Sequence, residues 1–201
     1  MAFLKVGKLC FQKSRTGILV ISLLSFIALS CSTQTGLPSQ QFSIIVEDPN
    51  RIRFSGKGAG AGMMLMSTLG PTGIAVGIAI DEGIGKEIDE RAKAGQVNIE
   101  RILQEQLAKT SIKYPPKTEI VIQRYGFLSS SENRDNVLPQ LHLVIISDGQ
   151  KRTLKYPEDY KEVASNPPSA PLEHVKSDAE VIEELLNKTA HFLVGEMISL
   201  Y

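Results

Sequence analysis

A chain of 201 residues suffices for one domain with a modest core, and its 22 basic and 22 acidic side chains balance. The balance is uneven: residues 1–30 hold four basic and no acidic side chains, so the remainder carries about four net negative charges. This argues against nucleic acid as a partner, because phosphate binding requires a basic face. Both cysteines, Cys10 and Cys31, lie near the N-terminus, which leaves no thiol for a disulfide or a metal site elsewhere.

Residues 1–30 have the pattern of a secretory signal. A basic stretch precedes the apolar run 17–29, which is short for a membrane-spanning helix of about 20 residues. The sequence IALSC, ending at Cys31, resembles the bacterial lipobox, in which the cysteine becomes the acylated N-terminus of the mature protein. The resemblance implies lipid attachment at Cys31, and Ser32 after it resembles cargo sorted to the outer membrane. The alternative is an uncleaved N-terminal anchor.

Residues 31–41 are polar and contain glycine and proline, which is typical of a flexible tether. The remaining residues, 42–201, are expected to form a single domain. It contains the most unusual stretch of the chain, residues 56–86, which is rich in glycine and uncharged from 59 to 80.

The apolar stretch is long enough for one helix to cross a hydrocarbon core of about 30 Å. Gly70 and Pro71 stand in its middle, however, and a glycine followed by proline is the usual break between two helices. Two helices of about 15 Å each cannot both span. The sequence therefore allows a kinked span, a re-entrant hairpin in one leaflet, or an arm that packs between subunits.

Small residues in this stretch recur at helical spacing. Gly73 and Gly77 are four apart, and Ala75, Ala79 and Gly83 form a second row, so two strips of backbone are open to a neighbouring helix. The pattern resembles the glycine-zipper segments of bacterial envelope lipoproteins. The positions predicted to pack against membrane or subunits are Gly60, Gly62, Gly70, Pro71, Gly73, Ala75, Gly77, Ala79 and Gly83. The alternative is a soluble helical hairpin or a mobile Gly-rich loop.

The second arm of the predicted hairpin continues into charged sequence. Ile80, Ile84 and Ile88 form a row with spacing four, so one helix is expected to run from an apolar environment into water and to end near residue 94. Asp81 and Glu82 are expected on a solvated face, where they mark the depth limit of the apolar part.

The flanking sequence predicts a small α+β fold. Alternating residues in 42–46 and 52–54 indicate a strand or a small hairpin, and strands are expected at 118–128, 141–146 and 152–156, the last two joined by a turn at Asp148 and Gly149. Asn98 and Asp178 are predicted N-caps of two amphipathic helices. Residues 157–171 are expected to be a long proline-rich loop. The expected sheet has three to five strands, packed against the two helices, with the helical hairpin inserted.

No pattern for enzymatic or metal chemistry stands out. The histidines, His142, His174 and His191, lack the spacing of a zinc site, and no other catalytic motif is present. The sequence therefore predicts a protein that is not an enzyme, with no catalytic residue, metal or cofactor.

The order of elements resembles the αβ domain of periplasmic outer-membrane lipoproteins of lipopolysaccharide export, curli secretion and plasmid surface exclusion, and surface-exclusion lipoproteins most. No functional residue transfers from these families. The resemblance implies an outer-membrane lipoprotein that faces the periplasm and acts in membrane-associated assembly or structure. Its expected partners are membrane lipid through acylated Cys31, and further copies of itself or another envelope protein. The alternative is a periplasmic plug or chaperone-like module for a secretion or transport machine.

Overall fold

The computed structural model describes residues 42–47, 50–110, 114–115, 117–130, 133, 135–160 and 167–199. All of them belong to the unit Gln40–Tyr201. The predicted signal, the tether and Cys31 lie outside the described residues.

The described residues form a mixed six-stranded sheet and five α-helices, which confirms the predicted α+β class. The sheet has one strand more than the three to five expected, because the two-residue β6 lies in the segment predicted to be a loop. In chain order the elements are β1 (Phe42–Val46), β2 (Arg53–Ser55), α2 (Lys57–Leu69), α3 (Pro71–Ala94), α4 (Ile99–Ala108), β3 (Thr118–Ser129), β4 (Asn136–Ser147), β5 (Gln150–Tyr156), the 3-10 helix η2 (Glu158–Tyr160), β6 (Ala170–Pro171), α5 (Leu172–Ser177) and α6 (Ala179–Ile198).

The main sheet has the strand order β1-β3-β4-β5. β1 is parallel to the first half of β3, with Phe42 opposite Thr118, and β2 is parallel to its end, with Phe54 opposite Phe127. The expectation that residues 42–54 form a small hairpin is therefore wrong, because both segments run in one direction along the same strand. The antiparallel pair β4 and β5 has the predicted turn at its end.

An irregularity in β3 changes which residues face the core. Ile120 and Ile122 are buried before a register shift that precedes Arg124, and Phe127 is buried after it. Because successive strand residues point to opposite faces, the shift places Arg124, with its partner His142, on the face away from buried Leu141. One face of the sheet thus carries the core, and the other carries polar side chains such as Arg124 and His142 beside apolar ones such as Val144.

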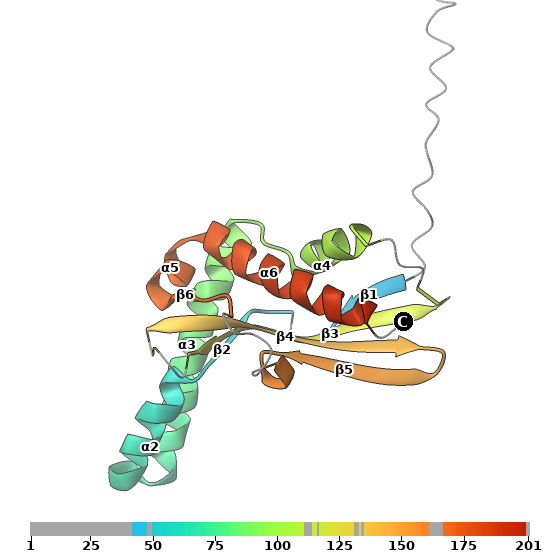
Figure 1. The fold of residues 1–201 in the computed structure, drawn as a ribbon. Helices are drawn as coiled ribbons and strands as arrows, with labels where there is room; N and C mark the ends of the chain where they lie inside the picture. The colour runs from blue at the N-terminus through green and yellow to red at the C-terminus, as the bar shows by residue number, and fades with distance from the viewer. Residues whose placement is uncertain are drawn as a thin grey trace, which may run out of the picture. The chain divides into compact units, whose positions relative to one another are not determined.

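The helices α4 and α6 cover the core face of the sheet (Figure 1). Both begin at the predicted caps: Asn98 Oδ1 accepts from the Arg101 backbone N–H at 2.9 Å, and Asp178 Oδ1 accepts from that of Glu180 at 2.9 Å. The fully buried side chains of this layer are Ile102, Leu103, Leu107, Ile182, Leu186, Leu193 and Met197.

Helix α3 connects this layer to the hairpin. Its C-terminal half buries Ile88 and Ala92 in the core, while α2 and the first half of α3 project on the other side of the sheet (Figure 1). In the predicted loop at 157–171 the described residues include η2 and β6, which pairs with β4.

Candidate functional site

The candidate site is the helical hairpin formed by α2 and α3. Gly70 ends α2 with φ +58°, a conformation that favours glycine, and Pro71 is the first residue of α3, as the sequence predicted. The Gly70 N–H donates to the Met66 carbonyl at 3.0 Å. Among the described residues, no helix combines the length and the apolarity needed to cross a membrane.

One face of α3 contacts the preceding chain along the whole hairpin. The row consists of residues with spacing four, which approach residues 52–66 in antiparallel order: Gly73, Gly77, Asp81, Gly85 and Asp89. Sequence inspection found its first two members but did not extend the register into the charged segment, where the same spacing continues.

Glycines hold the two arms at backbone contact. A Cβ on Gly73 would lie 2.6 Å from the Leu65 carbonyl carbon, and one on Gly58 would overlap the Gly77 carbonyl oxygen. A Cβ on Gly62 would lie 3.1 Å from the Gly73 carbonyl oxygen. The predicted packing positions Gly62, Gly73 and Gly77 therefore face the other arm of the same hairpin, rather than lipid or another subunit.

The other predicted positions lie on the outside of the hairpin. A Cβ at Gly60 or Gly83 would meet no described atom within 4 Å, and Ala75 and Ala79 are exposed. Gly70 and Pro71 form the turn at the tip. The structure thus divides the predicted set into an inner group that closes the hairpin and an outer group that remains accessible.

Asp81 caps the first arm from the second. Its carboxylate accepts the Gly56 N–H at 2.9 Å and the Gly58 N–H at 2.6 Å, at the start of α2, where no side chain of that segment serves as a cap. A carboxylate there satisfies free backbone donors and interacts favourably with the helix dipole. The expectation that Asp81 is on a solvated face is wrong, whereas Glu82 is exposed and pairs with Arg51 at 3.3 Å.

A second carboxylate attaches α3 to the sheet edge. Asp89 is nearly buried, accepts the Ile52 N–H at 2.9 Å and pairs with Lys93 at 2.6 Å. Nearby, the Tyr125 hydroxyl donates to Asn50 Oδ1 at 2.6 Å. Burial and, less strongly, the charge of Asp89 raise the pKa of Tyr125 to about 12. These contacts fix the base of the hairpin on the domain.

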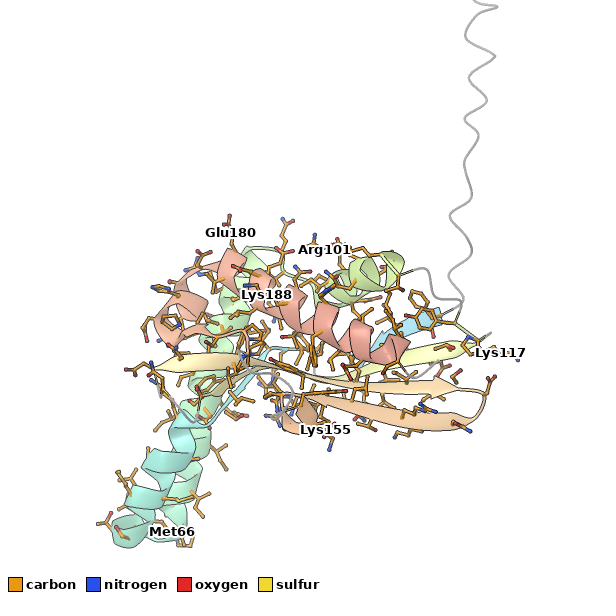
Figure 2. The ribbon with its side chains drawn as sticks, in the orientation of Figure 1. Met66, Arg101, Lys117, Lys155, Glu180 and Lys188 are labelled. Atoms are coloured by element: carbon orange, nitrogen blue, oxygen red, sulfur yellow. The ribbon has the colours of Figure 1, made fainter. Side chains whose placement is uncertain are left out.

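The projecting part of the hairpin is apolar on the outside. Met63 and Met64 are 74% and 75% exposed, and Ile78 on the other arm is 59% exposed. Large apolar side chains exposed on the hairpin are Met63, Met64, Met66, Leu69, Ile74, Ile78 and Ile80. Figure 2 shows Met66 near the end farthest from the sheet. Since contiguous exposed apolar surface marks contact sites, this tip is the strongest candidate for function.

Two hydroxyl groups near the tip, those of Ser67 and Thr68, are satisfied within the hairpin. Ser67 Oγ donates to the Met64 carbonyl at 2.7 Å, and Thr68 Oγ1 donates to the Leu65 carbonyl at 3.1 Å. Side-chain hydroxyls that return to the helix backbone present little unsatisfied polarity to an apolar environment.

The polar sheet face carries a histidine with a shifted pKa. Burial lowers the pKa of His142, the Arg124 and Lys155 charges lower it further, and the Glu158 carboxylate, 3.3 Å from Nε2, opposes them. Neutral imidazole is therefore favoured on this face.

Within the described ranges no group of three or more His, Cys, Asp or Glu side chains could hold a metal ion. No family model, curated protein or solved structure matches the chain.

Proposed function

We propose that this chain is a non-enzymatic lipoprotein of the bacterial outer membrane that acts in envelope assembly by inserting its hairpin into one leaflet. Lipid at Cys31 is the first anchor, the hairpin is the second, and the αβ domain faces the periplasm. The observation that carries the proposal is the exposed, uncharged surface of both hairpin arms. A protein partner would be expected to need one apolar face, whereas lipid surrounds a hairpin on all free sides.

The dimensions of the hairpin support a single leaflet. Residues 71–80 of α3 rise by about 15 Å, which is half of a hydrocarbon core of about 30 Å. Charged side chains begin directly below, at Lys57 on one arm and Asp81 on the other. Insertion deeper than this level would bring charges into hydrocarbon, at a cost of several kcal/mol.

Tether length is consistent with two anchors in the same leaflet. The segment between Cys31 and Phe42 reaches at most about 35 Å when extended. One acyl chain by itself gives marginal membrane binding, so a second apolar element would make the attachment stable.

Packing of hairpins from neighbouring copies is a second candidate. Ala75, Ala79 and Gly83 form an exposed row with spacing four on α3, which would allow close approach of another helix. This role is compatible with insertion and would give the assembly function a physical basis.

Membrane fractionation of unacylated protein tests insertion. We expect a Cys31→Ala variant to lose palmitate labelling but to remain partly with membranes, because the hairpin still inserts. Adding Met66→Glu and Ile74→Glu, one exposed position on each arm near the tip, should release it, since a charge deep in the hydrocarbon costs about 3 kcal/mol. Ile198→Glu is the matched control, because Ile198 is an exposed isoleucine outside the hairpin.

A Cys31→Ala protein that is entirely soluble would contradict hairpin insertion and favour the periplasmic plug or chaperone-like module. Palmitate labelling that persists in this variant would contradict acylation at Cys31. For the second candidate, Ala79→Leu should reduce crosslinking between copies in membranes, and unchanged crosslinking would refute hairpin packing.

A further inference from the structure

A cavity of about 420 Å³ lies at the foot of the hairpin, between α3 and the edge of the sheet at β2 and β3. Its volume is within the range of small-ligand sites. Its charged lining consists of Arg51, Arg53, Lys86, Arg124, Asp81, Glu82 and Asp89, and its apolar lining includes Phe54 and Ile78.

The three carboxylates of the cavity already have donors. Asp81 accepts two backbone N–H groups of α2, and Asp89 binds the Ile52 N–H and Lys93. Glu82 pairs with Arg51. Each of the three carboxylates is therefore already bound to a donor of the protein.

Two guanidinium groups of the cavity are available. No ion pair joins Arg53 or Arg124 to an acidic side chain of the described part of the chain. Arg124 Nε is shielded from solvent and has no acceptor among the described residues. Both arginines line the cavity, so an anionic oxygen there would meet charged donors that have no acidic partner among the described residues.

We propose that this cavity binds the phosphate of an anionic lipid headgroup in the leaflet that receives the hairpin. The inference rests on the proposed membrane insertion, because insertion brings headgroups to the level where the apolar tip meets the charged base. Arginine suits this ligand, since its planar donors match phosphate oxygens in pairs. Ile78 would contact the upper acyl chain.

Two lysines of β5 lie on the side of the sheet that would face the membrane. In β5, Lys151 and Lys155 lie opposite Ile146 and His142 on the face away from the core, whereas Arg152 lies opposite the core residue Ile145. Figure 2 shows Lys155 on the side of the sheet toward which the hairpin projects, and Glu180 and Lys188 on the opposite side, on α6. Helix α6 contains four glutamates and one lysine. An anionic membrane surface would attract these two lysines and repel the glutamates of α6.

Vesicle flotation with the mature chain carrying Cys31→Ala tests the site without the acyl anchor. The probes are vesicles of phosphatidylcholine alone and of phosphatidylcholine with phosphatidylglycerol. We expect a higher partition coefficient on the anionic vesicles. Replacing Arg53 and Arg124 by glutamine should lower this coefficient about fivefold for each charge removed. Lys188→Gln removes one positive charge on the opposite side, as Arg53→Gln alone does in the cavity, and should leave the gain in place.

The outcomes separate the two proposals. Equal binding to both vesicle types, unchanged by the arginine substitutions, would overturn the headgroup site and leave insertion intact. Absence of binding to both vesicle types would contradict insertion itself. Thermal unfolding checks that the variants are folded, and Arg53→Gln alone provides a second variant that retains the half-buried Arg124.

Inorganic phosphate, titrated without vesicles and followed by amide NMR shifts at the cavity, separates lipid from free phosphate. Weak, non-saturating shifts are expected. Saturation by free phosphate that anionic vesicles do not displace would assign the cavity to a soluble phosphate compound and overturn the lipid assignment.

Discussion

Asp81 joins the two arms of the hairpin through one carboxylate. It lies four residues after Gly77 and accepts two backbone N–H groups of the other arm. Hydrogen bonds to a charged group contribute about 1.5–3 kcal/mol each, more than an exposed ion pair. The Asp81 carboxylate therefore stabilises the closed base of the hairpin more than the exposed ion pair of Glu82 does.

We expect Asp81→Ala to lower the free energy of opening the hairpin by about 1–3 kcal/mol, because the N–H groups of Gly56 and Gly58 lose their acceptor. Amide hydrogen exchange of α2 measures this opening. The control is Glu82→Ala, which removes an exposed ion pair and should change the value by less than about 1 kcal/mol. Equal effects of the two substitutions would contradict the capping role.

His142 predicts a dependence of stability on pH. Its folded pKa is lowered, chiefly by burial, so below about pH 6.5 the unfolded chain binds a proton that the folded chain does not. The free energy of unfolding should therefore fall as pH decreases from about 6.5 toward the folded pKa.

Urea denaturation at a series of pH values measures this effect, and His142→Gln should reduce the fall. The exposed His191 provides the control, since His191→Gln retains His142. A stability that decreases equally in both variants would show that other groups cause the acid dependence.

At the scale of elements, α3 organises the molecule. Its C-terminal half buries Ile88 among the core residues, and its N-terminal half forms the second arm of the hairpin. Because one continuous helix runs through both regions, the orientation of the hairpin is fixed relative to the sheet. The two kinds of glycine on this helix, inner and outer, should respond oppositely to substitution.

Gly77→Ala should destabilise the protein by about 1–3 kcal/mol, because its Cβ would collide with the Gly58 carbonyl group and force the arms apart. Gly83→Ala should instead stabilise it by up to about 1 kcal/mol, since its Cβ would be free of contacts and alanine favours the helix. Thermal unfolding of the two variants measures the difference. The same sign for both would contradict the assignment of inner and outer faces.

At the scale of the whole molecule, the apolar tip shares one side of the sheet with Lys151 and Lys155 of β5, and the acidic helix α6 lies on the other side (Figure 2). Both the hydrophobic effect and electrostatics therefore favour one orientation on an anionic membrane. This orientation can be measured by comparing how deep residues on the two sides of the sheet lie in the membrane.

The chain has no tryptophan, so an introduced indole is the only one present. We expect the fluorescence of a Met66→Trp variant to shift to the blue on addition of vesicles and to be quenched by brominated lipid. Lys188→Trp, on the opposite side, should show neither change (Figure 2). Quenching of both positions would exclude a single orientation.

The sequence by itself determined the α+β class, the caps Asn98 and Asp178, the turn at Asp148 and the break at Gly70 and Pro71. Each of these depends on residues close together in the chain: a cap bonds within one helical turn, and proline restricts its own φ. The predicted packing positions also included the accessible ones on the outside of the hairpin, Gly60, Ala75, Ala79 and Gly83.

Only the tertiary structure decided which strands pair with β3, that Asp81 caps α2, and that Arg53 and Arg124 share a cavity. These features depend on segments up to about a third of the chain apart, and spacing along one helix or strand contains no information on what lies opposite. In helix α3 the sequence predicted Gly73 and Gly77 as packing positions, but the continuation of this row to Asp89 and the segment that it contacts were decided by folding.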